Sequence, residues 1–162
     1  MVVFLEPLDT TAAPSTQARR AVLRLGEQGL VPAVLAVAVG DSVRLANDTG
    51  IYHRLFSYSE SHPFDLGVLR RGDTRSIDLS TPGVVRIYCS LHPAERAVVY
   101  IAPSPYFATF RPPARFEIRD VPAGRYRLHA WSERAPATSR TVTVPPGASV
   151  AAEIAAPPAA HE

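Results

Sequence analysis

The stretch Gly83-Val-Val-Arg-Ile-Tyr-Cys89-Ser-Leu-His92-Pro-Ala-Glu95 joins an alternating segment to a short loop. Within it, apolar and polar side chains alternate over residues 85–89, which is the period of a half-buried β-strand. Cys89 ends this strand, and His92 and Glu95 follow within six residues. The stretch therefore predicts a thiolate and an imidazole close together on a tight loop at the end of a strand.

The same two-residue period recurs along the chain, and it predicts an all-β protein. Short strands separated by Gly, Pro and Asp turn signals, together with 16 prolines, are typical of a β-sandwich. One weak helix is expected, within Gln17–Leu25. Further alternating or β-branched runs lie at residues 43–45, 98–101, 116–118, 126–130, 142–144 and 150–154.

A domain boundary is expected near Pro103–Pro113, where four prolines fall in eleven residues. We predict one β-sandwich domain over residues 19–104 and a small second β-sandwich module over residues 105–156. The second part holds three or four strands, too few to be stable alone, so a strand at residues 2–6 is expected to complete it. The Ala/Pro-rich tail, residues 157–162, is expected to be disordered.

Composition excludes several classes of function. The chain is 46% hydrophobic and 20% charged, with a formal net charge of +2, and all of its 17 basic residues are arginines spread along the chain. Nucleic-acid binding would need clustered basic residues with interleaved aromatic ones, so it is not expected. No apolar run approaches the roughly 18 residues that a membrane span needs, so no membrane-spanning segment is expected.

The first residues, Met-Val-Val-Phe-Leu-Glu-Pro, show no basic segment and no small-residue cleavage site, so no signal peptide is expected within this sequence. That agrees with a cytosolic protein or with a mature exported one whose leader was replaced by a start Met. The single cysteine excludes an internal disulfide. In an exported protein an unpaired cysteine calls for a reason, such as burial, a partner chain or a metal.

A second histidine makes the metal interpretation the stronger one. His53 lies 36 residues before Cys89 and just past another expected strand end. Alone, Cys89 would be interpreted as a small core residue and His92 as a surface residue. A cysteine with two histidines on a β scaffold, however, is the ligand set of a trigonal electron-transfer copper site. Soft thiolate suits Cu(I), and imidazole binds both Cu(I) and Cu(II). A rigid β scaffold holds one ligand geometry for both oxidation states, so the ligands move little when an electron is transferred.

Residues from about 27 to 106 resemble the plastocyanin/azurin-like cupredoxins, and more closely the bacterial methylamine-utilisation or plastocyanin-like group. This resemblance implies a Greek-key sandwich, a periplasmic or otherwise exported protein, and one copper ion bound by His53 and His92 through Nδ1 and by Cys89 through sulfur. It also implies a redox partner that docks near His92, and an Asn47 side chain that braces the ligand loop. The matching stretches are Leu30-Val-Pro32, Val37-Ala-Val-Gly40-Asp41-Ser-Val43, Asn47-Asp48 with His53, Phe56-Ser-Tyr-Ser59, Phe64-Asp-Leu-Gly67, Pro82-Gly-Val-Val85, Tyr88-Cys89-Ser-Leu-His92-Pro93 and Pro105-Tyr106-Phe107.

The second part resembles another family. The pattern Phe116-x-Ile118-x-x-Val-Pro-Ala-Gly124-x-Tyr126-x-Leu128 is similar to the regulatory-like β-sandwich of carboxypeptidases. That module is not catalytic in those proteins. The resemblance thus implies a structural or docking unit for this part of the chain.

The ligand loop departs from the cupredoxin pattern at one position. Related loops read Cys-x-x-His-x-x-Met with a weak axial methionine, whereas this position is Glu95 and the only methionine is Met1. Glu95 either binds copper through oxygen as in red-copper relatives, or turns outward and leaves a three-coordinate type 1-like site, or marks a fold that has lost copper. Arg54 and Arg96 are possible ion-pair partners for it, and His62 is a spare imidazole interpreted as a loop residue.

Ligation by Glu95 would have two consequences. A hard anionic oxygen favours Cu(II), so it predicts a low reduction potential and a weak blue colour. Cys-His-His-Glu is also a credible tetrahedral zinc set, so zinc would compete.

Three functions remain open at this stage: electron transfer, non-redox copper or zinc binding and delivery, and a metal-free interaction module. An enzyme is not expected, because Cys89 and His92 come without an orienting third group or an oxyanion-hole motif. Among the three, the ligand set and the resemblance favour electron transfer.

Overall fold

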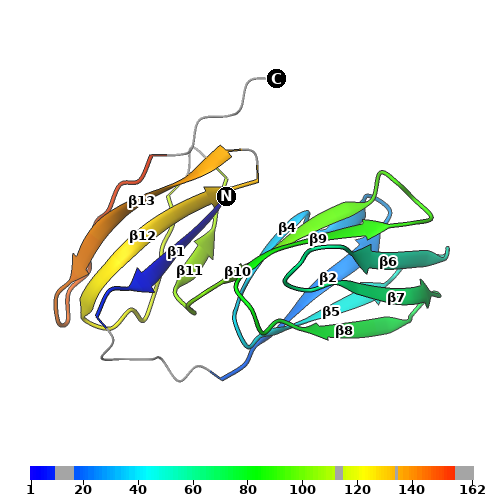
Figure 1. The fold of residues 1–162 in the computed structure, drawn as a ribbon, viewed down its shortest axis with the longest axis horizontal. Coiled ribbons are helices and arrows are strands. Elements are labelled where there is room, and N and C mark those ends of the chain that lie inside the picture. The colour runs from blue at the N-terminus through cyan, green and yellow to red at the C-terminus, as the bar shows by residue number, and fades with distance from the viewer. Residues whose placement is uncertain (10–16, 112–114, 134, 156–162) are drawn as a thin grey trace. The chain divides into compact units, whose positions relative to one another are not determined.

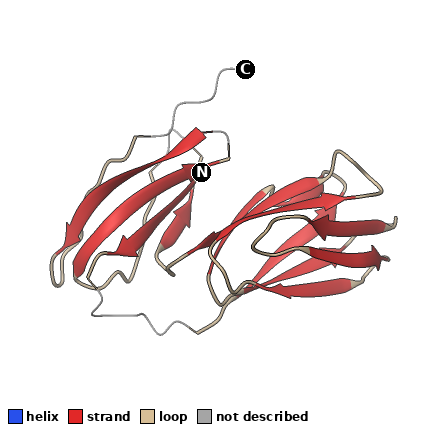
Figure 2. Cartoon of the chain, viewed as in Figure 1, coloured by secondary structure: helices blue, strands red, loops and turns tan. Residues whose placement is uncertain are grey.

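The computed structural model describes residues 1–9, 17–111, 115–133 and 135–155, and every regular element in these ranges is a β-strand (Figure 2). The all-β prediction is therefore confirmed. No helix in the described part of the chain has the length and apolar character that crossing a membrane requires. The predicted disordered tail lies outside the described residues.

The chain divides into two compact units. One unit is Gln17–Pro103, and the other contains the described residues of Met1–Thr16 and Ser104–Glu162.

The unit of residues 17–103 is built from two sheets (Figure 1). One sheet has the strand order β4-β10-β9-β6-β7 and the other the order β3-β2-β5-β8. Strand β4 runs parallel to β10 and β2 parallel to β5, whereas the remaining neighbours are antiparallel. The strands are β2 Arg20–Gly26, β3 Gly29–Val31, β4 Val34–Ala38, β5 Ser42–Asn47, β6 His53–Ser57, β7 Phe64–Leu69, β8 Thr74–Asp78, β9 Gly83–Cys89 and β10 Arg96–Ala102.

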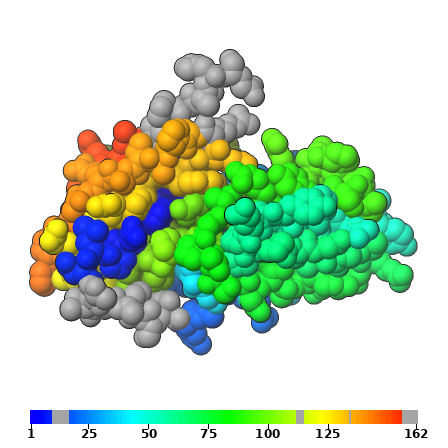
Figure 3. Space-filling model, viewed as in Figure 1, coloured from blue at the N-terminus to red at the C-terminus, as the bar shows by residue number. Residues whose placement is uncertain are grey.

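The core of this unit lies between its two sheets, so it is a β-sandwich. Leu23 and Leu45 from one sheet belong to the same buried cluster as Leu55, Ile87 and Val99 from the other, and all five are fully buried. In the space-filling view of the same face, atoms of residues 17–103 cover the gaps that separate the ribbons in Figure 1 (Figure 3). The alternation seen in the sequence therefore places every second side chain of these strands in one apolar layer.

The prediction of a weak helix within Gln17–Leu25 is wrong, because residues 20–26 form strand β2. Leu23 and Leu25 are buried while Arg24 between them is exposed, which is the strand period. The strand pairs in parallel with β5, and this backbone ladder with burial of two leucines outweighs a weak local helix preference.

The other unit contains a four-stranded antiparallel sheet in the order β11-β1-β12-β13. The N-terminal strand β1 is central in it, paired with β11 on one side and β12 on the other. Its buried Val3 and Leu5 belong to the core cluster of this unit. The strands are β1 Val2–Pro7, β11 Phe107–Thr109, β12 Gly124–Ser132 and β13 Ala135–Val144.

Two strand predictions for this unit are wrong. The structure has no strand at residues 116–118 or at residues 150–154. Their alternating apolar side chains nevertheless pack against the core of the sheet, among them Phe116, Ile118 and Ile154. The alternating pattern thus indicates that one side of the segment is buried. An extended segment can bury one side without forming the hydrogen bonds of a β-sheet.

Candidate metal centre

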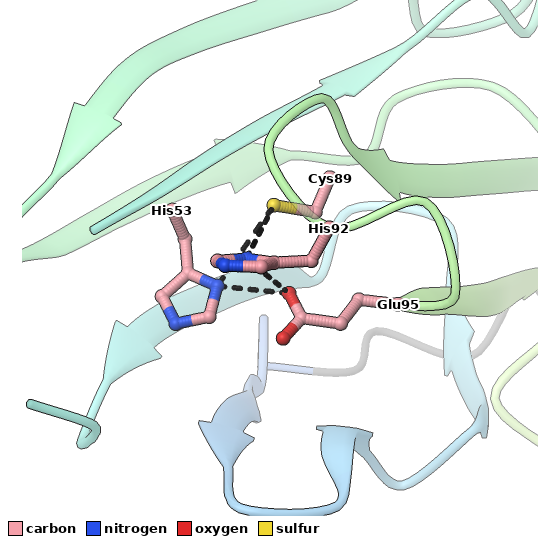
Figure 4. A group of neighbouring side chains, drawn as sticks. All are labelled: His53, Cys89, His92 and Glu95. Atoms are coloured by element: carbon pink, nitrogen blue, oxygen red, sulfur yellow. Dashed lines mark hydrogen bonds and ion pairs between the residues drawn. The ribbon is translucent and has the colours of Figure 1, made fainter. Parts of the chain in front are cut away.

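The candidate centre lies where two neighbouring strands of one sheet meet the loop after β9. His53 begins strand β6, and Cys89 ends strand β9. These strands pair antiparallel with Leu55 opposite Cys89, so the chain beyond Cys89 runs past His53. Figure 4 shows His92 and Glu95, both on that loop, directed toward the same point as His53 and Cys89.

Backbone hydrogen bonds close the loop into a tight turn. The Glu95 N–H donates to the His92 carbonyl at 2.9 Å, and the Cys89 N–H donates to the Glu95 carbonyl at 3.2 Å. The Ser90 N–H donates to the Arg54 carbonyl at 2.9 Å, which ties the loop to β6. The spacing Cys-x-x-His-x-x-Glu thereby brings three side chains to one side of a single turn.

The four side chains present one donor atom each within 4.8 Å of one another. Cys89 Sγ lies 3.6 Å from His92 Nδ1 and 3.8 Å from His53 Nδ1. Glu95 Oε2 lies 2.8 Å from His53 Nδ1 and 3.5 Å from His92 Nδ1. The group is largely withdrawn from solvent, because the side chains of His53, Glu95 and His92 are 0%, 16% and 34% exposed.

These distances fit ligands that share one metal ion. With metal–nitrogen bonds of about 2.0 Å and metal–sulfur bonds of about 2.3 Å, an N···S distance near 3.7 Å corresponds to an angle of roughly 120° at the metal. A thiolate and two imidazoles suit copper or zinc, and the carboxylate oxygen adds a hard fourth donor. The residues present therefore fit a copper ion, and they fit zinc as well.

A second set of hydrogen bonds holds the other ring nitrogen of His53, Nε2. Its Nε2 lies 2.8 Å from Thr49 Oγ1, and that hydroxyl lies 2.7 Å from Asn47 Oδ1. The fully buried Asn47 donates from Nδ2 to the carbonyls of Ile51 and Leu69 at 2.9 and 3.0 Å. Asn47 thus joins the end of β5, in one sheet, to the end of β7, in the other, beside the centre.

The remaining sequence candidates lie elsewhere. His62 is not in this group, since its Nε2 accepts a hydrogen bond from the Ser80 N–H at 3.1 Å. Arg54, considered as a partner for Glu95, pairs instead with Asp65 at 2.6 Å. Thr49 is the site residue that sequence reasoning missed, and its signal was a hydroxyl residue four positions before His53.

His62 predicts a pH dependence of stability. Partial burial lowers the pKa of His62 from its ordinary value near 6.5. The folded protein therefore favours the neutral ring, and the unfolded chain binds more protons below pH 6.5. Stability from this group is complete above pH 6.5 and decreases as the pH falls toward the lowered folded-state pKa.

We expect the free energy of unfolding to fall between pH 7 and pH 5 and His62→Gln to show a smaller fall, as measured by urea unfolding at each pH. An unchanged pH slope in this variant would contradict the assignment.

Fold and donor group together define a cupredoxin-like β-sandwich in residues 17–103. The chain is similar to plastocyanins. Over 76 aligned residues it is 29% identical to plastocyanin from Ulva pertusa, covering 41% of this chain and 78% of the relative, and the same figures hold for plastocyanin from Ulva arasakii. No family model matches the chain.

Two solved structures also match part of the chain. A purple cupredoxin from Nitrosopumilus maritimus matches at 24% identity and a TM-score of 0.47, covering 51% of this chain and 99% of its own. A copper-containing nitrite reductase from Thermus scotoductus matches at 19% identity and a TM-score of 0.49, covering 60% of this chain and 25% of its own. The resemblance of the C-terminal part to carboxypeptidase regulatory modules stays a prediction.

Proposed function

We propose that this protein binds one copper ion through His53, Cys89 and His92, with Glu95 at the fourth position, and carries electrons outside the cytoplasm. The observation that carries the proposal is the convergence of these four donors, from two strands and one loop, within 4.8 Å. The plastocyanin likeness supports the same function from the sequence.

The chain's own residues suit fast electron transfer. Bound copper would supply a one-electron couple between Cu(I) and Cu(II). His53 and Cys89 sit on paired strands with 0% and 3% of their surfaces exposed, so the scaffold holds both donors in one geometry. The His92 side chain is 34% exposed and follows Leu91, which is 50% exposed, so a redox partner could dock at this edge.

An enzymatic role for the same residues is less well supported. A cysteine nucleophile with a histidine base needs a third group on the other ring nitrogen of the histidine. Glu95 instead faces His92 Nδ1, the same nitrogen that faces the sulfur. The thiol is also only 3% exposed, which leaves a substrate little access. We therefore propose a carrier and not a catalyst.

Zinc or copper binding without redox cycling is the second candidate. The observation that favours it is the Glu95 carboxylate, whose Oε2 lies 2.8 Å from a ligand nitrogen. With this oxygen the group becomes Cys-His-His-Glu, which suits tetrahedral zinc. A protein for metal storage or delivery would use these donors unchanged.

Redox cycling of the copper-loaded protein separates the two candidates. For an electron carrier we expect reversible reduction and reoxidation, followed by cyclic voltammetry, with copper retained after many cycles. Irreversible reduction, or loss of copper on reduction, would contradict electron transfer and favour storage or delivery.

Cell fractionation of the native host tests the exported location. Recovery of the protein in the cytoplasmic fraction alone would contradict that location.

Replacing Glu95 tests the fourth position. In Glu95→Met we expect a higher reduction potential, a stronger blue absorption band and weaker zinc binding, because a soft thioether replaces a hard anionic oxygen. Optical titration, voltammetry and competition with zinc measure these changes. Glu60→Met, at an exposed residue outside the donor group, is the matched control. An unchanged potential and unchanged zinc affinity in Glu95→Met would show that Glu95 does not reach the metal.

A further inference from the structure

We propose that a partner protein inserts an extended strand into the cavity lined by residues 115–118 and 148–155. The inserted strand alternates polar and large aliphatic residues, and it is bound through its backbone and through every second side chain. This inference goes beyond the metal centre and does not depend on it, because the lining residues all belong to the unit of strands β1, β11, β12 and β13.

The cavity has a volume of about 960 Å³, which is about 30 times the share of one water molecule in the liquid. Packed protein cores contain few voids larger than a single water, so this space is large enough to admit a ligand. The sheet forms its floor, and two extended segments form its walls. The floor residues are Leu5 of β1, Leu128 of β12 and Val142 and Val144 of β13, and the wall residues are 115–118 and 148–155.

Apolar side chains that face this cavity are incompletely covered. Val3 and Ala130, in the packed part of the same core, are both 0% exposed. Phe116 and Ile118 in one wall are only partly buried, and Val150 in the other wall is 45% exposed. A β-sandwich is stable when two apolar layers are in contact, so the layer above this sheet has room for further apolar side chains.

The backbone of both walls favours a polypeptide as the ligand. Among the described residues, 115–121 and 149–155 belong to no sheet and form no backbone–backbone hydrogen bond. Side chains of β13 bind two carbonyls of the second segment, those of Glu153 and Ala155. Extended segments with unpaired N–H and C=O groups are templates for an added strand. A hydrocarbon chain could fill the cavity, but it would leave these groups without partners.

The direction of the wall backbone agrees with strand addition. Phe116 and Ile118 turn toward the core, whereas Arg115 and Glu117 are exposed. When side chains alternate in this way, the N–H and C=O groups point sideways, within the plane of the layer. A strand that enters the cavity beside this wall can therefore pair with it.

The other segments of this sequence are unsuited to fill the cavity. The apolar strands already pair in their own sheets. The residues outside the described ranges include no Val, Leu, Ile, Phe or Tyr, and proline among them lacks the N–H that a ladder needs. The inserted strand therefore comes from another protein. These outside residues are Thr-Thr-Ala-Ala-Pro-Ser-Thr at 10–16, Pro-Pro-Ala at 112–114, Arg at 134 and Ala-Pro-Pro-Ala-Ala-His-Glu at 156–162.

The test titrates the full chain with three probes. The first is the synthetic peptide Lys-Thr-Val-Thr-Val-Thr-Val-Lys, the second is the same peptide with N-methylated valines, and the third is sodium decanoate. N-methylation keeps the valine side chains but removes the N–H donors along one edge of the strand. Calorimetry measures the affinity of each probe, and NMR hydrogen exchange locates the backbone amides that become protected.

We expect the first peptide to bind and to slow amide exchange in residues 116–118 and 150–154 by at least about 10-fold. The N-methylated peptide should bind at least about 10-fold more weakly, because its backbone donors are lost. Decanoate should not bind. Equal binding of both peptides, or binding of decanoate in their place, would overturn the inference and indicate an apolar pocket.

A variant that fills the cavity locates the binding site. Ala152→Phe, at a partly buried wall residue, should abolish peptide binding, whereas Ala137→Phe, exposed on β13 outside the cavity, should leave it unchanged. Thermal unfolding followed by circular dichroism shows whether both variants fold. Absence of peptide binding to the wild type, amide protection confined to the edges of β11 or β13, or self-association of the chain that protects the same amides would each overturn the inference.

Discussion

Cys89→Ser is expected to abolish the thiolate-to-copper absorption band of the Cu(II)-loaded protein. The sulfur is the soft donor of the set, and its Sγ lies within 3.8 Å of both histidine nitrogens. A serine hydroxyl has similar size but offers neither the charge nor the polarizability of a thiolate. We also expect copper affinity to fall by more than the roughly 10- to 100-fold that loss of an outer partner costs. Optical titration with Cu²⁺ measures both changes.

The neighbouring residue provides the control for Cys89→Ser. Ser90 is exposed on the same loop, so Ser90→Ala should keep the band and the affinity. Cys89 is buried in the core cluster, and Cys89→Ala with a measured unfolding midpoint separates loss of a ligand from loss of the fold. A charge-transfer band that persists in a folded Cys89 variant would mean that copper binds elsewhere.

Asn47→Ala is expected to lower the free energy of unfolding of the 17–103 unit by about 2–4 kcal/mol, because each buried polar group left without a partner costs roughly 1–3 kcal/mol. The buried amide donates to the Ile51 and Leu69 carbonyls and so joins the two sheets beside the centre. The variant should also bind metal more weakly, since Thr49 loses the acceptor that orients it.

Urea unfolding followed by NMR signals of residues 17–103 measures the effect of Asn47→Ala. The only tryptophan, Trp131, lies in the other unit, so its fluorescence would not follow this transition directly. Asp48→Ala is the control, because it breaks only an exposed ion pair with Arg24, worth at most about 1 kcal/mol. A change in Asn47→Ala no larger than that of the control would contradict the bracing role.

The clustering of these four side chains could be predicted from the sequence because each lies at one end of a strand or in the short loop that follows a strand. The two-residue period placed Cys89 at the end of a strand, and short spacing kept His92 and Glu95 beside it. His53 needed more than local spacing, since β6 and β9 meet only through sheet pairing. The resemblance to cupredoxins supplied that step.

Other features depend on contacts that a local pattern does not contain. Strand β2 shows its period only when its burial against the sandwich core is known, so a helix was expected there. The direction of Glu95 stayed open because it depends on the turn that closes over residues 89–95. Thr49 was missed for a similar reason, since its hydroxyl gains a role only when the loop brings it to His53 Nε2.

The optical and EPR spectra of the protein loaded with one equivalent of Cu²⁺ test the central claim most directly. We expect stoichiometric binding, an intense sulfur-to-copper charge-transfer band, and a stability gain of about 2.7 kcal/mol when free copper is 100 times the dissociation constant. Absence of the band, with no stoichiometric copper and no change in stability, would contradict a copper site formed by His53, Cys89 and His92.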